Sequence, residues 1–124
     1  MSGTTDGLPG SFPEVERRAQ EWFQHLDAGD IDSTWHMFSG LFRDAIDEPT
    51  WKAKLEPVIE SCGTATTRVL ESQEFHEELP GVPPGNYAIR TYQTQFHSGL
   101  EVRERLTLVR ETDGGWGIAG YYLV

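Results

Sequence analysis

The residue with the clearest chemical potential in this sequence is Glu104, an acidic side chain inside an otherwise apolar alternation. Residues 100–111 alternate in the manner of a strand, and Leu106 and Leu108 fall on the same side as Glu104. Because a carboxylate is rarely buried without a partner, two interpretations are open. Either Glu104 bonds a helix residue or an arginine and fixes the structure, or it borders an open cavity. In an apolar cavity it could act as a general acid or base.

Two predicted tight turns decide which residues share the face of Glu104. Asp113 and Gly114 are typical of a hairpin turn, and Ser98 and Gly99 form the turn before it. Directly opposed side chains share a face of the sheet, and a one-residue slip in either turn would exchange the faces. The pairing predicts a core face made of Tyr87, Ile89, Thr91, Gln93, Val102, Glu104, Leu106, Leu108, Gly117, Ala119, Tyr121 and Leu123.

The candidate site around Glu104 contains one residue for catalysis and five for ligand contact. Glu104 is the candidate acid or base. The predicted pairing places the amide of Gln93 opposite Glu104 on one side and Leu123 opposite it on the other, with the phenol of Tyr121 opposite Leu106 nearby. Trp35 falls on the apolar stripe of a predicted helix, where packing into the core is the competing interpretation. The candidate ligand-binding residues are Gln93, Tyr121, Trp35, Tyr87 and Leu123.

The opposite face of the predicted sheet carries the arginines and a group of large apolar side chains. A patch of this kind without a ligand suggests contact with another subunit. We therefore expect this sheet face to contact another subunit, with the contacts made by Tyr92, Trp116, Ile118 and Tyr122.

Metal and nucleophilic chemistry have little support in the sequence. No histidine forms an i, i+4 pair or an HExxH motif, and "DAGDID" lacks the full calcium-loop pattern. Cys62 is the single cysteine, and its spacing on a predicted helix indicates a small buried apolar side chain. No glycine-rich phosphate loop follows a strand. We therefore expect no metal and no cofactor, and we interpret four histidines as surface or core residues: His25, His36, His76 and His97.

Three helices are expected to cover the core face. After a tail at residues 1–11, apolar residues recur at three- and four-residue steps from Val15 to Leu26, and "DAGD" ends this helix. Asp30 can cap a second helix, whose stripe runs from Ile31 to Ile46. A third helix begins near Pro49 and stops at Gly63. The apolar stripes consist of Val15, Ala19, Trp22, Phe23, Leu26, Ile31, Trp35, Phe38, Phe42, Ile46, Trp51, Leu55, Val58, Ile59 and Cys62.

The period of the apolar pattern changes to two after Gly63, which indicates strands. Strands are predicted at residues 64–75, 87–97, 100–111 and 116–124, and residues 76–86 form a loop dense in Pro and Gly. Helices followed by strands predict an α+β domain over residues 12–124. Its N-terminal helices pack on an antiparallel sheet of four or more strands.

The composition limits the classes of partner. The 124 residues suggest one domain, and a formal net charge of -10 argues against nucleic acid and against an anionic membrane surface. No apolar run approaches the roughly 20 residues of a membrane span. The start "MSGTTDGLPGSFPE" lacks a signal pattern, so we expect a cytoplasmic protein.

Two segments of the chain resemble known families. "LDAGDIDSTWHMFSGLFRD" resembles the opening helices of the NTF2-like superfamily. The second half is similar to the DUF4019 family, in which an LPG-x-P-x-G-x-Y segment, a Phe-ended strand, a Glu-led strand and a Trp-x-x-x-Gly-Tyr ending recur in that order. The resemblance covers residues 15–124 and implies a curved sheet that wraps the helices as a cone, with a pocket at its open end. It implies no catalytic residue. Two departures are the missing signal and Gly117, where the family usually has a basic residue.

Three hypotheses for function remain open at this point. The leading one is a small NTF2-like domain that binds a small, largely apolar molecule in a cone-shaped pocket. The second is a cofactor-independent isomerase, cyclase or dehydratase that uses Glu104 as its general acid–base, as the enzymes of the superfamily suggest. The third is a homodimeric interaction module that pairs through the sheet face, as the resemblance to NTF2-like domains implies. An open cavity beside Glu104 would favour the first two, and a filled core with Glu104 ion-paired would favour the third.

Overall fold

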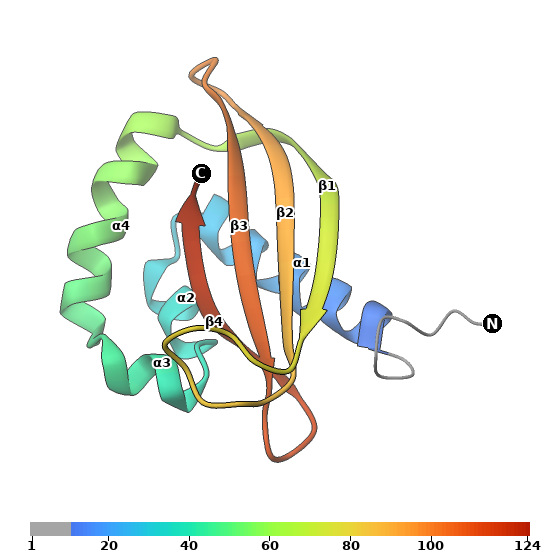
Figure 1. Cartoon of the computed structure of the whole chain (residues 1–124). Helices are drawn as coiled ribbons and strands as arrows, with labels where there is room; N and C mark the ends of the chain where they lie inside the picture. The colour runs from blue at the N-terminus through green and yellow to red at the C-terminus, as the bar shows by residue number, and fades with distance from the viewer. Residues whose placement is uncertain (1–10) are drawn as a thin grey trace.

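Helices come first along the chain and strands follow (Figure 1). The computed structural model describes residues 11–124, so the predicted tail lies outside the described residues apart from Ser11, at which the first helix begins. The described part has four helices and four strands: α1 Ser11–Asp27, α2 Ile31–His36, α3 Gly40–Ala45, α4 Glu48–Cys62, β1 Ala65–His76, β2 Tyr87–Phe96, β3 Glu101–Arg110 and β4 Trp116–Leu123. None of these helices is long and apolar enough to cross a membrane.

The strands form one antiparallel meander in the order β1–β2–β3–β4, which confirms the predicted α+β fold. Across residues 11–124, the helices lie against one face of this sheet, which we call the inner face, and leave the outer face without a helical layer (Figure 1). The first predicted apolar stripe is buried in the core, since Val15, Ala19, Trp22, Phe23 and Leu26 are all buried. Burial of these side chains against the sheet is the main force that holds the two layers together.

The second predicted helix is interrupted, and the interruption covers one edge of the sheet. Asp30 caps α2 as predicted, but the chain then runs beside β4 before Ser39 caps α3. Ser39 N donates to the carbonyl of Ile118 at 2.8 Å, and Ile118 N donates to the carbonyl of Met37 at 3.0 Å. Gly117 makes this approach possible, because a Cβ there would lie 2.9 Å from Ser39 Cα. Pairing in the ladder therefore ends the helix at this point.

The predicted face of β2 is wrong by one residue. Thr91 pairs with Arg105, and Gln93 pairs with Arg103, whereas the predicted partner of Gln93 was Glu104. The cause is the turn, in which Phe96 N donates to the carbonyl of Leu100 at 2.9 Å. The loop thus contains three residues, 97–99, rather than two, and a change of one residue exchanges the faces of a strand. The side chains that β2 turns to the helices are Ala88, Arg90, Tyr92 and Thr94.

The predicted face of β4 is correct at one end and wrong at the other. The pairs Glu104–Leu123 and Leu106–Tyr121 occur as predicted. A register shift between Thr107 and Leu108 then changes the pairing, and it brings the first residues of β4 to the inner face. The predicted dimer patch is consequently divided. Tyr122 is exposed on the outer face, whereas the other three members are buried in the core: Tyr92, Trp116 and Ile118.

Candidate functional site

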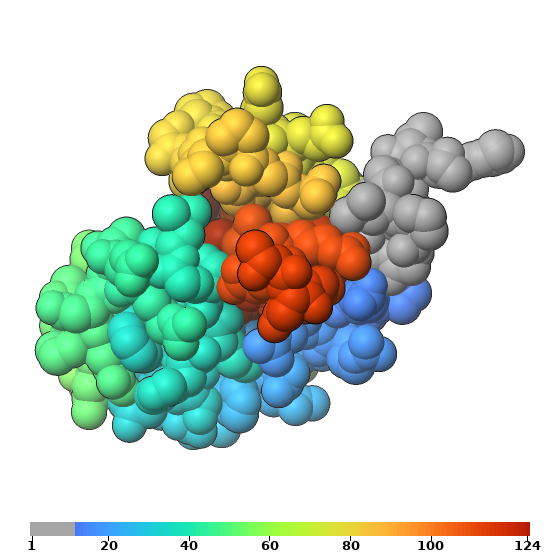
Figure 2. All heavy atoms as spheres, turned by 90° about the horizontal axis from the view of Figure 1, so that it is seen from below, coloured from blue at the N-terminus to red at the C-terminus, as the bar shows by residue number. Residues whose placement is uncertain are grey.

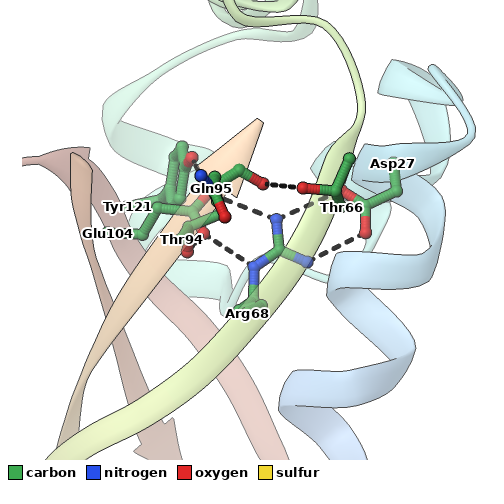
Figure 3. Close-up of polar contacts among 7 residues, drawn as sticks. All are labelled: Asp27, Thr66, Arg68, Thr94, Gln95, Glu104 and Tyr121. Atoms are coloured by element: carbon green, nitrogen blue, oxygen red, sulfur yellow. Dashed lines mark hydrogen bonds and ion pairs between the residues drawn. The ribbon is translucent and has the colours of Figure 1, made fainter. Parts of the chain in front are cut away.

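Glu104 lies at the centre of a closed polar network (Figure 3). Its side chain points inward from β3 and is 0% exposed. Oε1 accepts hydrogen bonds from Arg68 Nε at 2.6 Å and from Thr94 Oγ1 at 2.5 Å. Oε2 accepts from the Tyr121 hydroxyl at 2.5 Å and from Arg68 Nη2 at 3.4 Å. Each carboxylate oxygen therefore has two donors, which is what burial of a charged group requires.

Arg68 extends the network from the sheet to α1. Its Nη1 lies 2.8 Å from Asp27 Oδ2, and its Nη2 donates to Asp27 Oδ1 at 3.1 Å. The guanidinium also lies 3.9 Å from the ring centroid of Phe23. Burial alone lowers the pKa of Arg68, but the hydrogen bonds and charges of Asp27 and Glu104 raise this pKa above its ordinary value. Arg68 therefore stays charged between two carboxylates.

Tyr121 completes the network from β4. Its ring packs against Trp22, with the ring centroids 4.9 Å apart. Burial raises the pKa of Tyr121 above its ordinary value, and the negative charge of Glu104 and the hydrogen bond between the two raise it further. The hydroxyl thus remains protonated and donates to Glu104. With Tyr121 included, every strand of the sheet and α1 contribute one side chain to the network: Asp27, Arg68, Thr94, Glu104 and Tyr121.

Glu104 presents no accessible surface in this structure. A side chain without accessible surface has no water-sized space beside it, whether open or enclosed, and all four hydrogen bonds of this carboxylate come from the protein. A general base must come within hydrogen-bond reach of the proton that it abstracts. Of the two interpretations of Glu104, the structure shows the one in which an arginine pairs with it. The cavity expected along its side is filled.

The other predicted ligand-binding residues are spread over the molecule. Gln93 is exposed on the outer face, and Leu123 lies beside Glu104 in the ladder on the inner face. Tyr87 is buried under the loop at residues 77–86, where its hydroxyl donates to the carbonyl of Pro83 at 2.6 Å. Trp35 Nε1 donates to the carbonyl of Ile46 at 3.0 Å. Besides Leu123, only Tyr121 of the five is brought to Glu104.

Three members of the network were not among the predicted site residues: Arg68, Asp27 and Thr94. Arg68 falls in an alternating strand sequence directly before Val69 and Leu70. A charged residue beside these apolar residues was the available signal that it has a partner in the core. Asp27 was interpreted as part of the helix end, and Thr94 was assigned to the opposite face by the slip in β2. Cys62 is buried as predicted, and burial followed by the charge of Glu104 raises the pKa of its thiol.

A second buried ion pair lies on the inner face near the start of α1. Arg90 is 0% exposed, and its Nη2 pairs with Glu16. Its Nε and Nη1 have no hydrogen-bond partner among the described residues, and neither has Oε1 of Gln73, which pairs with Arg90 across the ladder. Buried polar groups are rarely left without partners, so these atoms mark an unusual position in the core.

Surface hollows occur at several other places. One of about 390 Å³ lies at the end of the molecule that Figure 2 shows, between α1, the chain around Met37 and the β3–β4 turn. It is lined by charges of both signs, including Arg18, whose Nε donates to the carbonyl of Trp116 at 2.9 Å. Within residues 11–124, no group of three His, Cys, Asp or Glu side chains is arranged to hold a metal ion.

Solved structures with a similar fold are known. Aln2 from a Streptomyces species is 16% identical, with a TM-score of 0.58 over 94% of this chain and 90% of that one. A protein from Catenulispora acidiphila is 18% identical, with a TM-score of 0.59 over 91% of this chain and 89% of that one. At such low identity the similarity shows the fold alone. No curated protein matches the sequence.

The family assignment comes from the sequence itself, and it agrees with the predicted resemblance. The family model described as "Protein of unknown function (DUF4019)" matches residues 18–121, which include α1 from its third turn, the other helices and nearly all of the sheet. The matched region contains every member of the Glu104 network. The chain belongs to the DUF4019 family, whose function is unknown.

Proposed function

We propose that this domain is a homodimeric interaction module and that its two copies meet through the outer face of the sheet. The observation that carries the proposal is the closed network at Glu104, which leaves no space for a ligand at the predicted site. Chemistry there would require a substrate to break an ion pair that the fold itself uses. The surface that remains open over the centre of the sheet is its outer face (Figure 1).

The outer face combines exposed apolar side chains with nearly balanced charge. Tyr122 is 51% exposed, and Val69 is exposed on β1. Arg103 and Glu71 pair at 3.0 Å. A net charge of -10 makes two copies repel each other, so contact is least unfavourable where positive and negative side chains cancel. This balance favours the outer face as the surface for a second copy.

The same face has a hollow that suits a side chain of the partner. The hollow has a volume of about 360 Å³ and lies over β1 and β2. Tyr122 lies on the same face but toward the other edge of the sheet, on β4. In a two-fold dimer each copy presents the same patch to the other, so the Tyr122 of each copy can enter the hollow of its partner. The outer-face residues that line the hollow are Thr67, Val69, Glu71, Gln93, Gln95 and Glu101.

Sedimentation velocity over a range of concentrations tests the proposal. The wild-type chain should sediment as a species of twice the 14.0 kDa of one chain. Tyr122→Glu and Val69→Glu should shift the protein to monomer, because each places a charge in the interface, while circular dichroism remains that of the wild type. Leu41→Glu alters an exposed leucine on α3 and is the matched control that stays dimeric. A monomeric wild type at all concentrations would refute the proposal.

The two ligand hypotheses are supported less well than the interaction module. We keep the NTF2-like assignment as part of the proposal, since the order of helices and strands suits it, but a cone-shaped pocket beside Glu104 has no space in this core. A thermal-shift screen with small hydrophobic acids and ketones should leave the melting temperature unchanged. A rise of several degrees with one compound would favour the apolar ligand instead.

A further inference from the structure

We propose that the free edge of β1, together with the groove between β1 and α1, binds an extended peptide segment that carries basic side chains. This surface runs along the edge of the sheet and adjoins the outer face, with which it shares Glu71, but its occupant is a different chain, so the proposal goes beyond the homodimer. We define the edge groove as the surface between α1 and residues 68–75 of β1. An added strand would pair with the backbone of β1, and its alternate side chains would enter the groove.

The two edges of the sheet differ. The edge of β4 is paired at Ile118 with the chain at residues 37–39 through two backbone hydrogen bonds. Strand β1 pairs with β2 on one side, and among the described residues nothing pairs with its other side. An open edge presents unpaired N–H and C=O groups, which are a template for another strand. At 12 residues, β1 is also the longest strand of the sheet.

Two adjoining hollows give the edge groove room for side chains. A hollow of about 290 Å³ lies between α1 and the start of β1, with Phe23, Leu70 and Tyr92 as its apolar part. A second, of about 510 Å³, is lined by Phe12 and by residues 70–75 of β1. Both include Leu70, so together they follow β1 along most of its length. An extended peptide could place one side chain in each.

The charges that the edge groove shows to solvent are acidic. The carboxylates of Glu16 and Asp27 are 36% and 30% exposed, whereas their partners Arg90 and Arg68 are 0% and 12% exposed. The negative members of both ion pairs therefore face outward and the positive members face the core. Glu74 adds an exposed carboxylate on β1. The net charge of -10 would also attract a basic partner from a distance.

A buried acceptor points to the same ligand chemistry. Gln73 lines the second hollow, and its Oε1 is buried without a hydrogen-bond partner among the described residues. A lysine or arginine side chain carries only donors, so it could satisfy this oxygen. Arg90 lies opposite Gln73 in the ladder, but neither of its two unpaired nitrogens, Nε and Nη1, donates to this oxygen. An acidic segment, including the β1 edge of a second copy, would meet like charges instead.

The probe for the test is a capped, fluorescein-labelled peptide of eight residues in which lysine and valine alternate. Fluorescence anisotropy should show saturable binding to the wild-type chain. The same peptide with glutamate in place of lysine should not bind. A version that is N-methylated at every residue keeps the charge but lacks backbone donors, so it should bind at least about tenfold more weakly. Equal binding of the methylated peptide, or no saturable binding, would overturn the proposal.

Two charge reversals separate the edge groove from the general charge of the protein. Glu74→Lys, on the rim of the groove, should weaken binding of the lysine peptide by about tenfold or more. Glu56→Lys makes the same change on an exposed position of α4 and should leave the affinity within about twofold. Equal loss in both variants would show that only the net charge acts and would overturn the proposal. Sedimentation of Glu74→Lys should match that of the wild type; loss of dimer there would assign the edge to a second copy instead.

Discussion

Tyr92 links the stability of this core to pH at the alkaline end. Burial raises the pKa of its hydroxyl to about 12, with the charge of Arg90 opposing the rise. The folded-state pKa thus lies above the unfolded value of about 10. Below pH 10 the contribution of Tyr92 to stability is complete, because both states hold the proton. As pH rises from 10 toward 12, the unfolded state loses its proton first and stability is lost.

Tyr92→Phe should therefore flatten the loss of stability above pH 10. The free energy of unfolding of the wild type should fall more steeply between pH 10 and 12, by up to about 1.4 kcal/mol per pH unit for the one proton concerned. Urea titrations at closely spaced pH values measure the difference. Parallel curves for wild type and Tyr92→Phe would contradict the assignment.

At the scale of elements, Gly117 determines how one edge of the sheet is covered. Its missing side chain lets the chain at Ser39 pair with β4. In Gly117→Ala the new Cβ would lie 2.9 Å from Ser39 Cα and 2.5 Å from Glu111 Oε1, so the α2–α3 linker must move. We expect a loss of about 1–3 kcal/mol in the free energy of unfolding. Hydrogen exchange should show weaker protection at the amides of Ser39 and Ile118.

The matched control for Gly117→Ala is Gly120→Ala in the same strand. A Cβ at Gly120 would meet Thr107 Cβ at 3.8 Å, which is an ordinary contact. This variant should change the free energy of unfolding by less than about 0.5 kcal/mol. If the two alanine variants were equally stable, the close approach at residue 117 would not hold the linker in place.

The helices and strands themselves were largely predictable from the sequence, but the register between the strands was not. The apolar stripe of α1 and the period of two in β1–β4 identified the elements, because burial on one face leaves a regular pattern. The register of β2 was missed because residues 97–99 suit a loop of two or of three residues equally well. The register shift at Thr107 leaves no pattern in the sequence. Both errors assigned side chains to the wrong face of the sheet, and both therefore changed the predicted site.

The candidate site was predictable only at Glu104 and Tyr121. Both lie in the β3–β4 hairpin, where Glu104 pairs with Leu123 and Tyr121 pairs with Leu106, so the turn sequence was sufficient to place them together on the inner face. The contact between Arg68 and Glu104 joins residues 36 positions apart, and the contact with Asp27 spans 41 positions. No local pattern encodes which arginine a buried glutamate selects. That choice depends on how α1 crosses the sheet.

At the scale of the whole molecule, the network of Glu104 joins both layers. Every strand and α1 supply one member, so a change in any of these elements reaches the same carboxylate. Such a network contributes little net stability when intact, because the cost of removing its charges from water offsets their attraction. Removing one member, however, leaves the charge of its partner buried and uncompensated. We infer that its main effect is to specify how α1 lies on the sheet.

A double-mutant cycle tests this inference. Arg68→Met alone should lower the free energy of unfolding by about 3–5 kcal/mol, because it leaves Glu104 charged in the core. Glu104→Leu alone should cost less, because Arg68 keeps its ion pair with Asp27. The double variant replaces both groups with apolar side chains and should be less destabilised than the sum of the two, with a coupling of about 1–3 kcal/mol. Asp27 then lacks its partner, so hydrogen exchange should rise at the C-terminal turn of α1 even where stability recovers. Additive effects and an unchanged α1 would mean that the pair packs locally and does not set the position of the helix.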